Sequence, residues 1–138
     1  MANAFELLAE LTTAARVVRT RLDQDFAPHG VTAQQAGVLL HMASGVTAVR
    51  ELRKAMSMDA AGMTRLLDRL ADRGLIERSA RDDDRRALTV TLTSRGEALA
   101  PTLPPVFGRV AAQLDAVPPS ELSAAVSCLR TISRVLDS

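Results

Sequence analysis

The spacing of apolar residues changes at Gly74, and this change restricts the possible folds more than any other feature of the chain. Apolar residues before it recur at intervals of three and four: Met63, Leu66, Leu67 and Leu70. That spacing predicts an amphipathic helix over about residues 60–73. After Gly74 we expect a short strand over residues 75–79, and apolar residues alternate with threonine over residues 88–92, which predicts a half-buried strand. The chain therefore changes from a helix to a β-hairpin.

A second set of signals surrounds this helix and hairpin. Residues 80–86 are polar apart from alanine and predict a charged loop, or wing, at the tip of the hairpin. Upstream, a short helix is expected over residues 47–55, followed by a tight turn at residues 57–58. Asp59 is a favourable N-cap for the next helix. A short helix, a tight turn, a capped helix and a hairpin in this order predict a winged helix-turn-helix.

The N-terminal third predicts two more helices. Apolar residues at helical spacing over residues 5–26 predict one long amphipathic helix, which Pro28 and Gly30 end. Thr32 is then expected to cap a second helix, because Gln35 stands three residues later in the position of a capping box.

The C-terminal third predicts a fifth helix that is interrupted and then a last helix. Ser94 and Glu97 form the sequence of a capping box, which predicts a helix start at Ser94. Three prolines predict a kink or break soon after: Pro101, Pro104 and Pro105. Pro118 and Pro119 stand at the expected start of the last helix, where proline is tolerated.

We therefore expect a single domain over residues 1–138, mainly α-helical with a small β-hairpin wing. Residues 31–93 are predicted to form the winged helix-turn-helix. Residues 1–30 and 94–138 carry apolar stripes that are too exposed for isolated helices, so we expect them to be dimerisation helices that intertwine with those of a second copy.

Basic residues concentrate in one part of the chain. The net charge is only +1, but residues 47–95 hold 11 of the 17 basic residues and 8 of the 16 acidic ones. All basic residues except Lys54 are arginines, whose planar group binds phosphate and guanine in a bidentate manner. This distribution predicts a basic face that binds double-stranded DNA.

The expected compartment is the cytoplasm. Cys128 is the only cysteine, so an internal disulfide is excluded, and we expect it to be a buried small apolar residue rather than a redox-sensing thiol. We expect neither a signal peptide nor a membrane-spanning helix, because the N-terminus lacks a basic segment before an apolar run and no apolar run approaches about 18 residues.

Three blocks of sequence resemble the MarR family of bacterial transcription regulators. Residues 66–78 read Leu-Leu-Asp-Arg-Leu-Ala-Asp-Arg-Gly-Leu-Ile-Glu-Arg, similar to the end of the family's recognition helix and its first wing strand. Residues 84–87 and 90–96 follow at the right interval. A weaker match runs from Arg21 to Gln35.

This resemblance implies a homodimer that places its recognition helix, here about residues 60–73, in the major groove of DNA. It also implies that Arg86 enters the minor groove, with Asp84 supporting it, and that a small-molecule effector, often phenolic, releases DNA. The chain departs from many members at Ala60-Ala61-Gly62, where they carry polar residues, and at the proline cluster of the fifth helix.

The candidate DNA-binding residues follow from these elements. Thr64 and Arg65 are candidates for base contacts, and Arg65 is equally a candidate for a phosphate contact. Ala60 and Ala61 can contact only thymine methyl groups. Cations on the helices and the first strand are candidates for phosphate contacts: Arg50, Arg53, Lys54, Arg69, Arg73 and Arg78. The wing contributes Asp84, Arg85 and Arg86.

An effector pocket is predicted only loosely. Arg16 and Arg19 are candidates to pair with a carboxylate effector, and His41 to line the pocket, although solvated helix arginines and a partly buried histidine are the simpler interpretation. We expect no cofactor, because Asp82–Asp84 lack the spacing of a calcium loop and two histidines with one cysteine do not make a zinc site.

Two other function classes differ from a DNA-binding regulator in the residues that they require. An enzyme is not expected, because the chain has no phosphate-binding glycine loop and no recognisable set of catalytic residues. A winged-helix module that binds protein instead of DNA remains the alternative; arginines on both the recognition helix and the wing tip argue against it.

Overall fold

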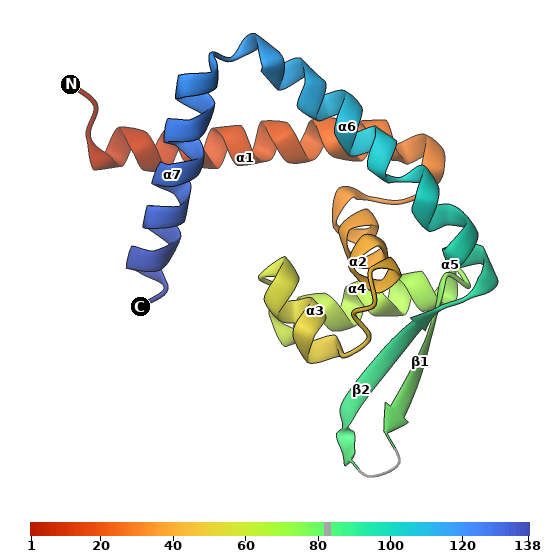
Figure 1. Cartoon of the computed structure of the whole chain (residues 1–138). Helices are drawn as coiled ribbons and strands as arrows, with labels where there is room; N and C mark the ends of the chain where they lie inside the picture. The colour runs from red at the N-terminus through yellow and green to blue at the C-terminus, as the bar shows by residue number, and fades with distance from the viewer. Residues whose placement is uncertain (82–83) are drawn as a thin grey trace. The chain divides into compact units, whose positions relative to one another are not determined.

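The computed structural model describes residues 1–81 and 84–138, and it describes side chains outside residues 80–87. The helices and strands follow the predicted order (Figure 1). The α-helices are α1 (Ala4–Phe26), α2 (Ala33–Ala43), α3 (Val49–Met56), α4 (Ala60–Asp72), α5 (Ser94–Leu99), α6 (Pro104–Gln113) and α7 (Pro119–Leu136). The strands are β1 (Ile76–Arg81) and β2 (Asp84–Leu92), and the short 3-10 helices are η1 (Ala27–His29), η2 (Ala100–Thr102) and η3 (Leu114–Ala116).

The chain divides into two compact units, Met1–Phe107 and Gly108–Ser138. The first unit contains α1 to α5, the hairpin and the start of α6, and the second contains the rest of α6 and α7. None of the described helices is both long and apolar enough to cross a membrane.

Helices α2, α3 and α4 gather beside one end of the hairpin, whose strands then extend away from them (Figure 1). The strands are antiparallel, with Ile76 opposite Leu92 and Arg78 opposite Val90. The segment before α3 joins this sheet, because the Val90 N–H donates to the Thr47 carbonyl at 2.8 Å. An isolated antiparallel bridge pairs Ala48 with Thr89 of β2, and α3 begins at Val49, two residues later than predicted.

The two strands of the hairpin extend beyond the residues over which apolar and polar side chains alternate. We expected a loop over residues 80–86, but β1 continues to Arg81 and β2 begins at Asp84. Backbone hydrogen bonds between strands do not require apolar side chains, so alternation marks only the half-buried part of a strand.

The core of the first unit is mostly aliphatic. The largest fully buried side chains come from α1 to α4, from β2, and from the start of α6 and the residue before it: Phe26, Val38, Leu39, Leu52, Met63, Leu70, Val90, Leu103 and Val106. Phe26 at the end of α1 meets Phe107 of α6 edge-on, with ring centroids 4.8 Å apart and an interplanar angle of 67°. The inward face predicted for α4 is confirmed, since Met63, Leu66, Leu67 and Leu70 are all buried.

The predicted helix boundaries are largely confirmed by the caps. The Gln35 N–H donates to Thr32 Oγ1 at 3.2 Å and the Thr32 N–H donates to Gln35 Oε1 at 3.0 Å, which completes the capping box of α2. Gly30 has φ of +76° after η1, and the prolines separate α5 from α6 through η2.

One cap was wrong by one residue. Thr93, not Ser94, caps α5: Thr93 Oγ1 accepts from the Gly96 N–H at 3.2 Å and donates to the Gly74 carbonyl at 2.5 Å. Thr93 still has extended backbone at the end of β2, whereas Ser94 is already helical.

The prediction that Cys128 is buried was also wrong. Cys128 is exposed, and α7 has no buried residue. Helix α1 buries only Phe26, while Phe5 at its other end is 84% exposed. The apolar stripes of these two helices are expected to be covered by a second copy, and within the described chain they stay uncovered.

Candidate nucleic-acid interface

The exposed side of α4 carries the residues predicted to read DNA. Its buried stripe faces the core, so Ala60, Ala61, Thr64, Arg65 and Arg69 all face solvent. The hydroxyl of Thr64 donates to the Ala60 carbonyl at 2.8 Å, which leaves its oxygen free to accept from a base. This face therefore presents two arginines beside small side chains that allow a close approach.

The start of α4 is held by Asp59. Its Oδ1 accepts from the Gly62 N–H at 2.7 Å, as the predicted N-cap requires. The turn before it uses Ser57 in the left-handed region, with φ of +52°. This turn joins α3 to α4 and fixes the first residues of the exposed face.

We expect Asp59→Ala to lower the free energy of unfolding by about 1 kcal/mol, because it leaves the Gly62 N–H without its cap. Urea unfolding measures the loss. Asp59→Asn is the control, because asparagine caps about as well. Equal destabilisation by both variants would contradict the capping role.

The three basic residues of α3 differ in exposure. Arg50 and Lys54 are exposed, while Arg53 is half-buried and its Nε has no hydrogen-bond partner among the described residues. These three cations are placed on one short helix next to α4, as a set of phosphate contacts requires.

The side chains of Arg78 and Arg73 each contact another segment of the first unit. Arg78 of β1 donates from Nη1 to Oδ1 of Asp68 on α4. Arg73 caps the end of α4, and its guanidinium packs against Gly30, where an added Cβ would lie 2.6 Å from Nη2. The side chains of Asp84, Arg85 and Arg86, predicted to form the wing tip, lie outside the described residues.

A cleft of about 620 Å³ opens beside α4. Arg19 of α1 lines it together with Arg65 and Arg69, as do the carboxylates of Asp23 and Asp59. Both carboxylates already accept backbone hydrogen bonds, from Ala33 and Gly62 respectively. The cleft is thus lined by three guanidinium groups and by two carboxylates that each accept a backbone hydrogen bond.

This cleft only partly matches the predicted effector pocket. Arg19 lines it, but Arg16 and the half-buried His41 do not. The sequence pattern predicts a role for Arg65 and Arg69 in DNA binding alone, and it predicts no site for Asp23 or Gln34, which also line this cleft. These residues come from three helices, α1, α2 and α4, so their spacing along the chain does not predict that they line one cleft.

A second hollow, of about 540 Å³, lies between the end of α2, β2 and the start of α5 and η2. Most of its lining is apolar, with Glu97 as its one charged residue. No spacing of residues along the chain predicts this hollow. Among the described side chains, which exclude residues 80–87, no three from His, Cys, Asp or Glu are grouped as a metal site would require.

Proteins that are similar to this chain in sequence are MarR family regulators. The sequence model of the MarR family matches residues 29–87. The multiple antibiotic resistance protein MarR of Escherichia coli is 39% identical over 80 residues, which are 56% of this chain and 55% of that protein. MarR of Salmonella typhimurium is 40% identical over the same length. The match thus spans about half the length of these curated relatives.

Solved structures extend the likeness to nearly the whole chain. A mutant MarR from E. coli complexed with operator DNA is 25% identical, with a TM-score of 0.76 over 95% of this chain and 99% of that chain. The MepR–DNA complex of S. aureus, 19% identical, has a TM-score of 0.84 over 98% of this chain and 99% of that one. The sequence blocks, the helix order and the hairpin of this chain are therefore all similar to those of the MarR family of winged-helix transcription regulators.

Proposed function

We propose that this protein is a transcription repressor that binds a palindromic site in double-stranded DNA as a homodimer. The observation that carries the proposal is the exposed face of α4, where Arg65 and Arg69 stand beside small residues and next to a projecting hairpin. An α-helix fits the major groove, and arginine is the commonest side chain to bind guanine there. MepR and E. coli MarR, which share this fold, were solved with DNA bound.

The hairpin supplies the second contact in this proposal. With α4 in the major groove, the hairpin reaches the neighbouring minor groove, which Arg86 would enter with support from Asp84. Arg85 and the cations of α3, namely Arg50, Arg53 and Lys54, would bind phosphates and fix the register of the protein on the duplex.

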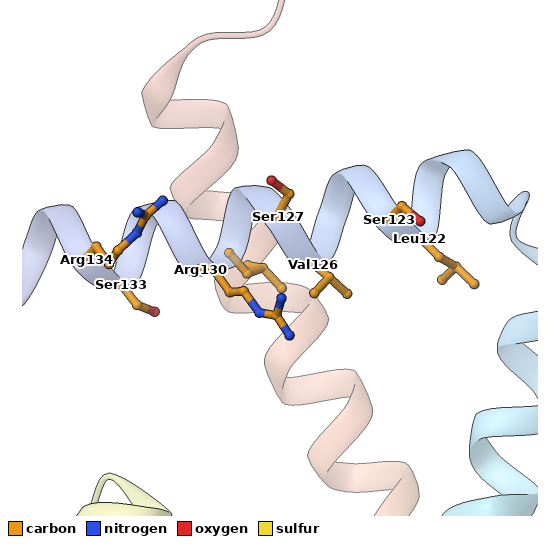
Figure 2. A pocket seen from close by; sticks show the side chains of 8 residues that line it. Leu122, Ser123, Val126, Ser127, Arg130, Ser133 and Arg134 are labelled. Carbon is orange, nitrogen blue, oxygen red and sulfur yellow. The ribbon is translucent and has the colours of Figure 1, made fainter.

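The homodimer is supported by the uncovered apolar faces of α1 and α7. On α7, an open hollow is lined by residues of that helix alone, with Leu122, Val126 and Arg130 pointing to the same side (Figure 2). Val126 and Leu129 are 46% and 43% exposed. A second copy would cover these stripes, with residues 1–30 and 94–138 as the dimerisation segments, and would place two α4 helices about one DNA turn, roughly 34 Å, apart.

The cleft beside α4 supports regulation by a small anion. Arg19, Arg65 and Arg69 line it, so a carboxylate or phenolate bound there would engage two of the arginines proposed to contact DNA. Binding of such an effector and of DNA would then compete for the same side chains, and the effector would release the DNA.

The proposal is tested by selecting duplexes from a random pool and measuring binding by fluorescence anisotropy. We expect a palindromic site, two protomers per duplex, and much weaker binding to a scrambled duplex. Arg86→Ala should weaken binding to the selected site. If no duplex is enriched even at low salt, a winged-helix module that binds protein becomes the better account.

A further inference from the structure

One ion pair joins the two parts of the proposed DNA interface. Arg78 Nη1 on β1 donates to Asp68 Oδ1 on α4, and the two side chains are 39% and 49% exposed. The other ion pair among the described residues joins Arg21 and Asp25, which lie one turn apart in the same helix, α1. The pair of Asp68 and Arg78 is therefore the one that links two different elements among the described residues.

The strand register explains how Arg78 reaches α4. Side chains alternate along a strand, so Arg78 leaves β1 on the same face as Ile76, two residues earlier. Ile76 is buried, and so is Val90, which stands opposite Arg78 on β2. Arg78 thus starts from the core face of the hairpin, and its long side chain extends past the edge of the core to Asp68.

Stability alone gives little reason for this pair. Ion pairs this exposed add little to the free energy of folding, because water screens both charges. An acidic side chain on a helix that approaches DNA is also unfavourable, since it repels the phosphates. Asp68 is therefore costly on α4 unless it helps to bind DNA in another way.

The groove geometry supplies that role. A helix in the major groove and a hairpin in the next minor groove are separated by one sugar–phosphate backbone. Arg78 lies at the junction of α4 and the hairpin, so in the proposed complex it faces this backbone. A guanidinium has five N–H donors, and the bond to Asp68 uses one nitrogen, which leaves Nη2 and Nε for a phosphate.

We propose that Asp68 is a positioning residue that holds the guanidinium of Arg78 against the DNA phosphate between the two grooves. This inference rests on the proposed function. It predicts that a carboxylate on the DNA-binding helix strengthens DNA binding, which is the opposite of its simple electrostatic effect.

Asp68→Asn and Asp72→Asn form the decisive comparison. Both remove one negative charge from α4, and Asp72 is exposed with no ion pair among the described residues. Anisotropy on the selected duplex should show Asp72→Asn binding as tightly as the wild type or tighter. Asp68→Asn should bind about tenfold more weakly, because Arg78 loses its orientation.

Two further variants show that Asp68 acts through Arg78. Arg78→Gln should lower the slope of log K against log salt by about 0.9, the value for one phosphate contact. In the Arg78→Gln background, Asp68→Asn should no longer weaken binding. Arg78→Lys keeps the charge but should also bind more weakly, since one ammonium group does not reproduce the planar fork.

Thermal unfolding of each variant separates positioning from a folding defect. We expect melting temperatures close to that of the wild type, because the pair is exposed. If the wild type binds and the Asp68 and Asp72 variants behave alike, or if weaker binding follows lower melting temperature, the inference is overturned while the proposed function stands. A wild-type chain that binds no duplex overturns both.

Discussion

Gly96→Ala should destabilise the fold by about 3 kcal/mol, the upper part of the usual range for overpacking. An alanine Cβ at this position would lie 2.2 Å from the carbonyl oxygen of Leu75 and 3.2 Å from Leu92 Cδ2. The carbonyl belongs to the backbone and cannot move aside as a side chain can. The start of α5 would have to separate from the start of the hairpin, which would also strain the cap formed by Thr93.

Gly108→Ala is the matched control for this prediction. Gly108 lies in α6, and an added Cβ there meets nothing within 4 Å. Alanine in a helix interior is favoured over glycine by about 1 kcal/mol, so this variant should be slightly more stable. Urea unfolding of the two variants beside the wild type measures both effects. If Gly96→Ala and Gly108→Ala shift the midpoint in the same direction, the close packing at Gly96 is not what restricts that position.

Removing both arginines from the exposed face of α4 should nearly abolish specific DNA binding. Arg65→Ala with Arg69→Ala should weaken binding by about 100-fold or more, because a direct base contact by arginine is worth about 1–3 kcal/mol and a phosphate contact is lost as well. Both side chains are exposed, so the fold should be retained. Anisotropy on the selected and scrambled duplexes measures the loss of affinity and of selectivity.

Arg16→Ala is the control for the double variant. Arg16 is exposed on α1 and does not line the cleft beside α4, so its loss changes the net charge away from the proposed interface. Its affinity should stay within about twofold of the wild type, as expected for a screened surface charge. If the double variant and the control lose similar affinity for both duplexes, α4 is not the recognition helix.

Features set by neighbouring residues could be predicted from the sequence. The capping box of Thr32 and Gln35, the cap at Asp59 and the buried stripe of α4 each depend on residues within one or two helical turns. The same holds for the helix break at the prolines, because proline acts on the turn that precedes it.

Features that depend on residues distant in the chain were missed. Thr93 and Ser94 are both good caps, and Thr93 takes the role where β2 ends and its hydroxyl meets the Gly74 carbonyl. The pair of Asp68 and Arg78 needs the helix and strand to be folded against each other. Burial of Cys128 was inferred from an apolar stripe, but a stripe does not say whether the chain itself covers it.

The central claim is that α4 and the hairpin bind double-stranded DNA, and the salt dependence of that binding tests it most directly. Affinity for the selected duplex should be measured by anisotropy between about 50 and 200 mM salt, a range over which six or more phosphate contacts lower affinity by about 10³-fold or more. We predict such a steep linear decrease of log K with log salt, together with preference for the selected duplex over the scrambled one at every salt concentration. An affinity that is independent of salt, or equal for the two duplexes throughout, would contradict the account.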